Sequence, residues 1–510
     1  VVAVGSRQLI PYLPDAVPGW FQAAVTLFDP AGAEIARGDD LRFRPDPVLH
    51  CEIPKDGEYV LEVRDALYRG REDFVYRIAI GELPYLTGLF PLGGRTGEVI
   101  PIDLVGWNLP ATTLKSPAQP RGVHFVSVLK GTLLSNRKPF VVDTMPECRE
   151  REPNNEISSA QRIGLPVVIN GRIDHPGDKD VFCFEGRAGQ QIVAEVKARR
   201  LGSLLDSALS LIDANGKQTA FNDDWEDRTA PLATHHADSC LRTTLPAEGL
   251  YYLHVVDQQG KGGAEHGYRL HVAAPNPDFE LRIVPPSINA RAGTTVPIVA
   301  HVLRREGFTG DVALSLKEAP PGFRLCGAHV PAGQDSIPLT LSVPTESRSE
   351  PYSLSIVGRA SIQGREVTRP AVPAEDMMQA FAYRHLVPAQ ELKVAVWGRA
   401  APNAAARIVS AVPLKIPPGG AARVEVSVPA PPMAGEIGFS LNGAPDGITL
   451  KEFSGRMLVI EVDAAKIKPG LVGNLIVETF VQRAAADVPE NKRRVPLGAL
   501  PAIPFEIVKP

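Results

Sequence analysis

The sequence predicts an all-β protein built from tandem β-sandwich domains, with very little helix. Apolar and polar residues alternate in many short runs, such as VPIVAHVLRR (296–305) and RMLVIEV (456–462), and a period of two is typical of half-buried strands. Proline and glycine account for 48 and 45 of the 510 residues, and they stand mainly between these runs, where turns are expected. Internal repeats further predict that whole domains are used more than once.

Length and charge limit the class of protein. A chain of 510 residues is expected to hold three to five domains. Its net charge of -4 gives no reason to expect a nucleic-acid partner. No apolar run approaches the 18 or so residues of a membrane-spanning helix, so no membrane span is predicted.

The first repeat covers most of one domain. Residues 25–40 (VTLFDPAGAEIARGDD) match residues 209–224 (LSLIDANGKQTAFNDD) without a gap. Three further matches keep the same order: 1–9 with 193–201, 46–65 with 238–257, and 76–78 with 268–270. The second copy has about 45 residues before these matches, from Cys148 to Ile192, that the first copy lacks. We therefore expect Val1 to lie inside a domain of a longer chain.

A second repeat lies in the C-terminal half. Residues 310–325 (GDVALSLKEAPPGFRL) match residues 435–450 (GEIGFSLNGAPDGITL), and each stretch is flanked by valine-rich runs that read as strands of a sandwich. One helix is predicted, over residues 375–386 (EDMMQAFAYRHL). Met377, Met378, Phe381 and His385 would share one face of it. That face would pack at a sandwich end or domain junction, and a binding role is the alternative.

The second copy resembles the bacterial pre-peptidase C-terminal (PPC) domain family. The resemblance covers about 125 residues and implies a jelly-roll-type β-sandwich. The stretches that carry it are EPNNEISSAQRI (152–163), GRIDHPGDKDVFCFEGRAGQ (171–190), LDSALSLIDANG (205–216) and LPAEGLYYLHVVD (245–257). In secreted peptidases such domains accompany the catalytic part, and in collagenases related domains bind collagen and calcium.

Five domains are expected from the repeats and the resemblance. FPLGGRTG (90–97) and GWNLP (106–110) resemble an IPT/TIG-like immunoglobulin-like module. The expected division is 1–81, PPC-like and lacking its N-terminal third; 82–146, IPT/TIG-like; 147–276, complete PPC-like; 277–398, immunoglobulin-like with the short helix; and 399–510, C-terminal immunoglobulin-like.

The resemblance also implies a calcium site. In the family, ligands come from the pattern Glu-x-Glu-x-Asn-Asp/Asn, which Glu150, Glu152, Asn154 and Asn155 match in CREREPNNEI (148–157). Asn155 stands where the family can have an aspartate, and this lowers the charge of the site. Further carboxylates are expected from DHPGDKD (174–180), with Asp174, Asp178 and Asp180 left open and the last two preferred.

The residue types themselves agree with calcium, which prefers carboxylate and amide oxygens. In an extended chain Glu150, Glu152 and Asn154 share a face, over which the DHPGDKD turn could close. The alternative is a solvated acidic strand whose asparagines cap a turn. The sequence leaves the choice open.

Other polar clusters have simpler explanations beside their functional ones. An acidic set could hold calcium, although the β-turn at Asp213–Gly216 explains it better: its members are Asp206, Asp213, Asp223, Asp224, Glu226 and Asp227. His235-His236 with Asp238 could bind zinc or copper or serve a hydrolase, or be an exposed loop. Arg37-Gly38-Asp39 has the form of an adhesion tripeptide, but the repeat assigns its aspartate to a turn.

Five cysteines without close spacing argue against a zinc knuckle or a disulfide framework. Cys183 and Cys240 are the one pair for which a bridge is considered, with free buried thiols as the alternative.

No enzyme motif stands out: GxSxG, HExxH and the P-loop pattern are all missing. We therefore expect a non-catalytic exported protein, secreted, periplasmic or on the cell surface. It would bind a protein or polysaccharide in an adhesion or scaffold role. The alternative is the accessory region of a larger exported peptidase or other hydrolase, with further domains upstream.

Overall fold

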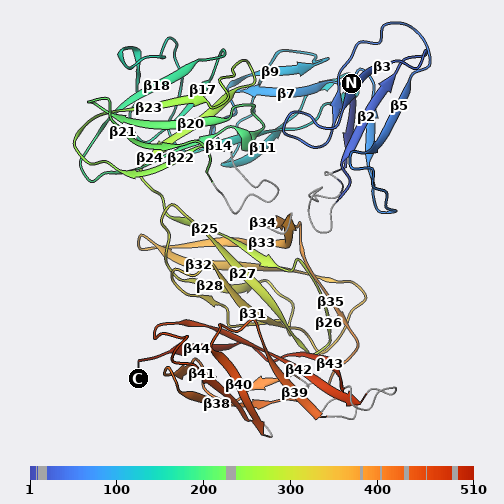
Figure 1. Ribbon diagram of the computed structural model, residues 1–510, viewed down its shortest axis with the longest axis vertical. Coiled ribbons are helices and arrows are strands. Elements are labelled where there is room, and N and C mark those ends of the chain that lie inside the picture. The colour runs from blue at the N-terminus through green and yellow to red at the C-terminus, as the bar shows by residue number, and fades with distance from the viewer. Residues whose placement is uncertain are drawn as a thin grey trace. The chain divides into compact units, whose positions relative to one another are not determined.

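The computed structural model describes residues 1–6, 9, 20–225, 237–379, 383–401, 405–429, 436–454, 457–484 and 492–509. Its regular elements are β-strands and two short 3-10 helices, which confirms the predicted all-β class (Figure 1). Two compact units can be separated, Val1–Pro275 with Met377–His385 and Asn276–Asp376 with Leu386–Pro510. Within the described ranges, no helix has the length and apolar character to cross a bilayer.

The first copy of the repeat, residues 1–81, forms two three-stranded sheets. Their strand orders are β4 (Val48–Leu49), β1 (Val2–Gly5), β6 (Arg77–Ile80) and β3 (Glu34–Gly38), β2 (Ala23–Phe28), β5 (Val60–Asp65). Alternate apolar residues of the central strands face inward, so that Val4, Val25 and Leu27 are buried in the core between the sheets.

The second copy, residues 147–276, forms two five-stranded sheets. One has the order β15 (Glu147–Arg149), β17 (Val167–Arg172), β24 (Gly267–Ala273), β19 (Gln191–Lys197), β22 (Cys240–Thr244). The other has the order β16 (Gln161–Arg162), β18 (Lys179–Gly186), β23 (Gly249–Asp257), β20 (Ser207–Asp213), β21 (Gln218–Asn222). The 3-10 helices are η1 (Ile157–Ser159) and η2 (Arg199–Leu201). Phe182, Phe184 and Leu253 lie in the core between the sheets.

The match between the copies extends to strand register. Val25 pairs with Gly38 in the first copy, and at the equivalent place Leu209 pairs with Asn222 in the second. Both ladders carry a bulge at the same position. The second copy has four further strands, β15 to β18, which span residues 147–186 and precede the part matched by the sequence repeat. Those strands extend each sheet beyond β24 and β23.

Residues 82–146 form a smaller sandwich of two three-stranded sheets. Its strands are β7 (Tyr85–Phe90), β8 (Gly93–Arg95), β9 (Pro101–Trp107), β10 (Thr113–Lys115), β11 (Gly122–Val126), β12 (Leu129–Lys130), β13 (Leu133–Leu134) and β14 (Lys138–Asp143). The sheet orders are β10-β9-β7 and β11-β14-β8, with a separate β12-β13 hairpin. A Cβ on Gly93 would lie 2.1 Å from the carbonyl oxygen of Val141, so only glycine lets β8 pair with β14 here.

The strands between residues 278 and 397 form one extended network. They are β25 (Asp278–Val284), β26 (Ser287–Arg291), β27 (Thr295–Arg305), β28 (Val312–Lys317), β29 (Arg324–Cys326), β30 (His329–Val330), β31 (Ser336–Ser342), β32 (Tyr352–Ile362), β33 (Arg365–Gln379), β34 (Tyr383–Pro388) and β35 (Leu392–Trp397). The main path runs β26-β35-β32-β33-β25-β27-β31-β29. Phe279, Leu281 and Leu339 are fully buried in its core.

The C-terminal residues 405–509 form a sandwich of two sheets. Its strands are β36 (Arg407–Ile408), β37 (Leu414–Ile416), β38 (Ala421–Ser427), β39 (Glu436–Asn442), β40 (Ile448–Ser454), β41 (Met457–Val462), β42 (Val472–Ala484), β43 (Lys492–Ala499) and β44 (Ile503–Ile507). The sheet orders are β36-β38-β41-β40 and β37-β44-β42-β39, with β43 on β42. Ala313 pairs with Arg359, and the equivalent Gly438 pairs with Phe480. Each of the two matched stretches therefore contains a strand that pairs antiparallel with a later, long strand of its own domain.

The helix predicted over residues 375–386 is wrong. Residues up to Gln379 belong to β33 and residues from Tyr383 to β34, and these two strands pair. Met377 and Met378 therefore lie on opposite faces of a strand, one buried and one exposed, and His385 is buried in β34. Phe381 lies outside the described residues. The hairpin from β32 continues through this segment, and ladder pairing outweighs its helical spacing.

We retain the five-domain division as a proposal. Every described sheet has all its strands within a single one of the five ranges, which supports it.

Candidate metal site

The CREREPNNEI segment crosses from one sheet of the second copy to the other. After β15, which runs parallel to β17, the backbone N–H of Glu150 donates to the carbonyl of Asn170 at 3.0 Å. Four residues later the carbonyl of Asn154 accepts from the N–H of Val181 in β18, also at 3.0 Å. The segment is therefore fixed at both ends and closes one end of the sandwich.

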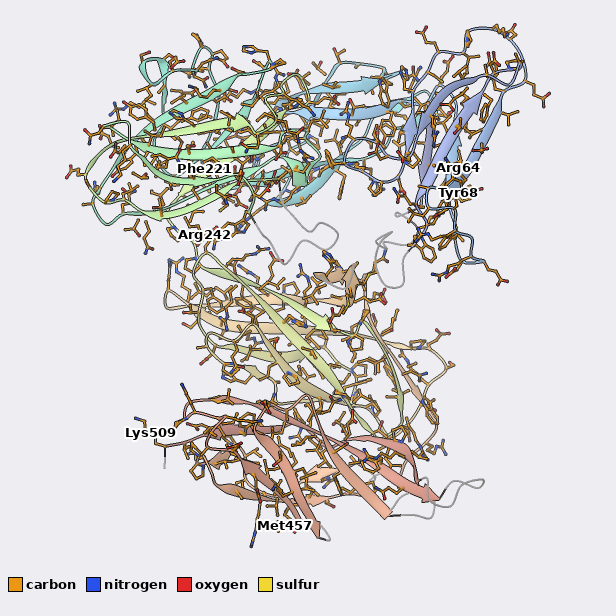
Figure 2. The ribbon with its side chains drawn as sticks, viewed as in Figure 1. Arg64, Tyr68, Phe221, Arg242, Met457 and Lys509 are labelled. Atoms are coloured by element: carbon orange, nitrogen blue, oxygen red, sulfur yellow. The ribbon has the colours of Figure 1, made fainter. Side chains whose placement is uncertain are left out.

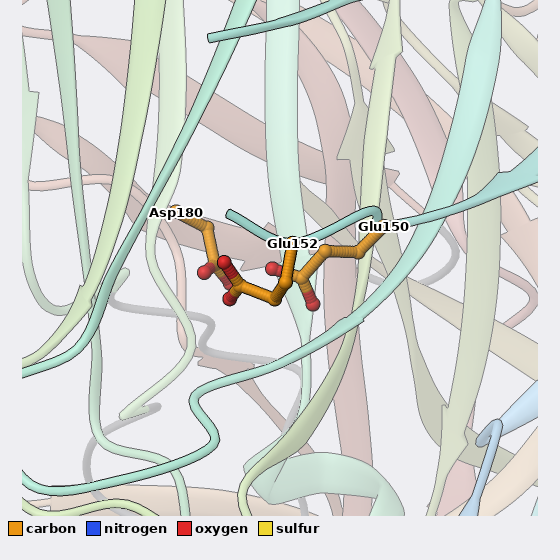
Figure 3. Close-up of side chains that lie close together, drawn as sticks. All are labelled: Glu150, Glu152 and Asp180. Carbon is orange, nitrogen blue, oxygen red and sulfur yellow. The ribbon is translucent and has the colours of Figure 1, made fainter. Parts of the chain in front are cut away.

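Three carboxylates meet where this segment crosses. Oxygen atoms of Glu150, Glu152 and Asp180, one from each, lie within 4.8 Å of one another, and Figure 3 shows the side chains turned toward a common point. Asp180 is buried in β18, Glu150 is half-buried and Glu152 is exposed. We call these three residues the acid cluster. Among the described residues, it is the one group of three or more such side chains close enough to hold one ion.

Neutral donors hold the acid cluster in place. The Nδ2 of Asn154 donates to Oε1 of Glu150 at 3.0 Å, and the backbone N–H of Asn154 donates to Oε2 of Glu152 at 3.0 Å. The N–H of Arg172 donates to the other oxygen of Glu150 at 2.7 Å. No described ion pair joins a cation to any of the three carboxylates, so their mutual repulsion is not offset by a basic side chain there.

Two buried oxygens at the cluster have no described hydrogen-bond partner. They are Oδ1 of Asn154 and Oδ1 of Asp180. Leaving a buried polar atom unpaired costs about 1–3 kcal/mol, more when it is charged. An amide oxygen and a carboxylate oxygen are ligands that calcium prefers, and Glu150 and Glu152 add further carboxylate oxygens beside them. The residues present therefore fit a calcium ion.

The closeness of Glu150 and Asp180 favours retention of a proton by this pair when no cation is bound. Burial raises the pKa of Asp180 to about 11, and the neighbouring carboxylate of Glu150 adds to the increase. Burial likewise raises the pKa of Glu150. Two facing carboxylate oxygens repel unless a proton or a metal ion lies between them. Cation binding would thus displace a proton.

The DHPGDKD turn supports the cluster from outside. Asp178 is buried and accepts from Nδ2 of Asn155 at 2.9 Å, from the N–H of Asp174 at 2.7 Å and from the N–H of Lys179 at 3.0 Å. Asp174 is exposed and pairs with the guanidinium of Arg172. Of the three aspartates left open by the sequence, Asp180 alone joins the acid cluster, while Asp178 and Asn155 fix the turn.

Tyr268 belongs to the site, although sequence reasoning missed it. Its hydroxyl donates to Oδ2 of Asp180 at 2.6 Å, and the whole side chain is buried. The register places Gly171 opposite it, and a Cβ there would lie 2.3 Å from the tyrosine ring. Glycine at 171 is therefore what lets Tyr268 cross β17 and reach Asp180. The Tyr-Arg pair that recurs at 76–77 and 268–269 was the available signal in the sequence, but a repeat does not show which residue of another strand lies opposite it.

Arg269, next in sequence, ties β15 to the body of the sheet. Its guanidinium is fully buried and donates to Glu147 at 2.6 Å and to Oδ1 of Asn170 at 2.7 Å. A buried arginine needs such an acid, since an unpaired buried charge is strongly destabilising. This pair fixes the strand that leads into the acid cluster.

The described members of the second acidic set, Asp206, Asp213, Asp223 and Asp224, do not form a group that could hold one ion. Oδ1 of Asp213 accepts the N–H groups of Asn215 and Lys217 at 2.9 Å each, which closes the turn between β20 and β21. Asp29 does the same at the equivalent turn of the first copy. Asp206 accepts from Gln259, and Asp223 caps the N–H of Asp224. Glu226 and Asp227 lie outside the described residues.

Asp238 of the proposed His-His-x-Asp cluster is bonded to residues 198–200. Asp238 is buried and accepts from the N–H groups of Ala198, Arg199 and Arg200 and from the Arg200 guanidinium, so it anchors η2. His235 and His236 lie outside the described residues. The Arg37-Gly38-Asp39 tripeptide ends β3, where Gly38 pairs with Val25, in agreement with the repeat.

The Cys183–Cys240 bridge is not formed, and both thiols are free and buried. Cys183 alternates with Phe182 and Phe184, which face the core, and Cys240 precedes Leu241, which also faces the core. The two sulfurs therefore lie on the outer faces of different sheets. The free-thiol alternative is confirmed.

No family model matches the chain. A "Probable subtilase-type serine protease" of Deinococcus radiodurans is 39% identical over 158 residues, which are 29% of this chain and 20% of that protein. The chain thus spans about a fifth of the length of this curated relative.

Solved structures with some likeness include the pre-peptidase C-terminal domain of a collagenase from Bacillus anthracis. It is 21% identical and has a TM-score of 0.17, and the match covers 24% of this chain and 99% of that domain. A SusE-like surface-located polysaccharide-binding protein of Bacteroides thetaiotaomicron is 12% identical with a TM-score of 0.14, over 85% of this chain and 70% of that one. Such scores add nothing to the fold described above.

The Tyr268→Phe variant is expected to lower the free energy of unfolding of the second copy by about 1–3 kcal/mol, because Oδ2 of Asp180 loses its buried donor. Hydrogen exchange of β18 and β24 in increasing urea would measure it. Tyr76→Phe is the matched control in the first copy, where the ring is exposed, and should change stability by less than about 0.5 kcal/mol. Equal effects of the two variants would contradict the assigned hydrogen bond.

With calcium removed by a chelator, the stability of the second copy is expected to fall as pH rises from 7 to 9. Folded Asp180, with its raised pKa, keeps a proton that the unfolded chain has lost above about pH 4, so the slope reaches about 1.4 kcal/mol per pH unit. Asp180→Asn should lack this slope. Urea unfolding of both proteins at each pH gives the difference between their free energies of unfolding. Groups common to both proteins cancel in this difference. One of them is Lys138, because burial lowers its pKa to about 7. A difference independent of pH would rule out the shared proton.

Proposed function

We propose that this chain is a calcium-stabilised, non-catalytic accessory region of an exported protein. The observation that carries the proposal is the acid cluster of the second copy. It brings an exposed, a half-buried and a buried carboxylate together, and two buried oxygens there, Oδ1 of Asn154 and Oδ1 of Asp180, have no described hydrogen-bond partner. Glu150, Glu152, Asn154 and Asn155 match, position by position, a pattern that the PPC resemblance associates with calcium. Membership of the PPC family itself is part of the proposal.

Calcium would be held by the carboxylates of Glu150, Glu152 and Asp180 together with the amide oxygen of Asn154. Asn155 and Asp178 would keep the surrounding turn closed. When bound, the ion supplies positive charge that offsets the repulsion of the cluster. Because the CREREPNNEI segment and β18 belong to opposite sides of the sandwich end, binding at this point would hold the two sheets together.

An accessory role is supported by the similarity to a probable subtilase-type serine protease. The matched part is about a fifth of the length of that protease. We place this role ahead of a stand-alone adhesion protein, because that relative joins similar sequence to a named catalytic class. The region would bind a protein or polysaccharide substrate, and the working location would be the cell surface, the periplasm or the medium. The IPT/TIG-like and immunoglobulin-like assignments are kept as part of the same proposal.

Calcium is expected to raise the thermal unfolding midpoint of the chelator-treated chain. At a free calcium concentration one hundred times the Kd, binding to the folded state alone adds about 2.7 kcal/mol. Asp180→Asn and Glu150→Gln should remove the shift. Differential scanning calorimetry would measure the unfolding midpoint, and isothermal titration calorimetry would measure the Kd for calcium.

Asp174→Asn is the matched control, since Asp174 is exposed and outside the cluster, and it should respond to calcium like the unchanged chain. An unchanged midpoint at millimolar calcium, or a shift that survives in Asp180→Asn, would remove the calcium part of the proposal.

The purified chain is expected to show no hydrolysis of casein and no labelling by a fluorophosphonate that reacts with activated serines. The physical reason is that neither a nucleophile motif nor its surroundings is evident in the sequence. Fluorescent casein and gel-based labelling would measure this with a subtilisin control. A labelled serine in this chain would overturn the non-catalytic assignment.

A further inference from the structure

One long β-hairpin in the sandwich of residues 82–146 is apolar on the side that faces away from the core. It runs from β11 through β12 and β13 to β14, residues 122–142, and we call it the apolar hairpin. Along its first arm every second residue is exposed, namely Val123 (59%), Phe125 (61%), Ser127 and Leu129 (60%). The outward face of an antiparallel strand is usually polar, because it meets water. Here that face carries large apolar side chains.

The tip of the apolar hairpin exposes leucines on both of its faces. Leu129 pairs with Leu134, which is 61% exposed. The next pair, Lys130 with Leu133, points to the opposite face, and Leu133 is 40% exposed. Gly131, with a φ of 60°, begins the two-residue loop between these strands. A flat protein partner would cover one face of such a tip, whereas a lipid interface that takes in the tip covers both.

The part of the chain that holds the apolar hairpin carries only positive charge. Between Asp103 and Asp143 the sequence has no Asp or Glu, and its Lys and Arg residues are Lys115, Arg121, Lys130, Arg137 and Lys138. The net charge of -4 for the whole chain therefore conceals a local basic segment. Exposed apolar side chains combined with basic residues are complementary to a surface with negative headgroups and an apolar interior, which is an anionic lipid surface.

Glu265 of the second copy approaches this segment near Lys138, but its charge is already neutralised. Arg42 donates to its two carboxylate oxygens, at 2.6 and 2.5 Å. The positive charge of Lys130, which is half-buried, and of Arg137, which is exposed, therefore remains available to an anionic partner.

We propose that the apolar hairpin docks on an anionic lipid surface, with Phe125, Leu129 and Leu134 inserted at the level of the headgroups. Lys130 and Arg137 attract the negative headgroups, and burial of the apolar side chains adds affinity once the tip has entered. This inference goes beyond the proposed function. It requires neither the acid cluster nor a bound calcium ion, and it gives the sandwich of residues 82–146 a role of its own.

The test uses the full chain in chelator, so that calcium cannot bridge carboxylates to lipid. Co-sedimentation would measure its binding to vesicles of phosphatidylcholine and phosphatidylglycerol in equal parts. Vesicles of phosphatidylcholine alone should bind at least about tenfold more weakly, because each basic residue near an anionic surface contributes about fivefold. Raising the salt from about 0.05 M to about 0.5 M should weaken binding to the anionic vesicles, since salt screens this attraction.

Phe125→Ser and Leu134→Ser are each expected to weaken binding by about tenfold, because each removes one inserted apolar side chain. Phe221→Ser is the matched control. Phe221 is 50% exposed on β21 of the second copy, where Figure 2 labels it, and its replacement should leave binding unchanged. Equal thermal unfolding midpoints would show that the three variants fold like the unchanged chain.

Fluorescence separates insertion from adsorption by charge alone. Leu134→Trp adds an indole at the tip, and lipids brominated in their acyl chains should quench its emission when vesicles are bound. Phe221→Trp should not be quenched. The unchanged chain gives the background of its four tryptophans.

Three results would overturn the proposal. They are absence of binding to the anionic vesicles, equal affinities of Leu134→Ser and Phe221→Ser, and unquenched emission of bound Leu134→Trp. Binding of polyglutamate that Phe125→Ser and Leu134→Ser abolish, without binding to vesicles, would also contradict it, because the apolar hairpin would then serve an acidic protein partner.

Discussion

A β-sandwich requires that its inner apolar faces be closed and that its central strands be paired on both sides. In the second copy, β17 and β18 meet this requirement for β24 and β23, and the path of the chain into β17 carries residues 150–156 across the sandwich end. The acid cluster exists because of that path. In the first copy the described strands show the same central pairing, β5 with β2 and β6 with β1. The closing of the second sandwich by β17 and β18 thus accounts for the position of the metal site.

Burial of carboxylates is costly in an apolar core, and the molecule limits that cost in two different ways. Glu147 is neutralised by the buried guanidinium of Arg269, so this pair is complete within the protein. Asp180 instead has a tyrosine hydroxyl on one oxygen and nothing on the other. A site of the first kind is structural, whereas a site of the second kind changes its stability with whatever proton or ion it holds.

Patterns that repeat along the chain could be read from the sequence, and contacts across strands could not. Alternation and the two repeats gave the fold class and even the equivalence of strands, because register follows the hydrophobic pattern. The family-like motif pointed to Glu150 and to Asp180 among three aspartates. The roles of Tyr268 and Gly171 could not be predicted, because the two residues lie opposite each other only through the pairing of β17 with β24. The segment 375–386 was misassigned because its apolar spacing fits a helix, while continuation of a long hairpin decides its structure.

The connection between the sandwich of residues 82–146 and the second copy affects how readily the chain could be cleaved by peptidases. β14 ends at Asp143 and β15 begins at Glu147, so few residues connect the two sandwiches. Glu147 is held by Arg269, and the backbone beyond it bonds to β17 and then to β18. A protease needs several residues of free, extended backbone to cleave, and this connection offers almost none. Linkers between domains are common sites of proteolysis, and this short, hydrogen-bonded connection is expected to be a poor protease substrate.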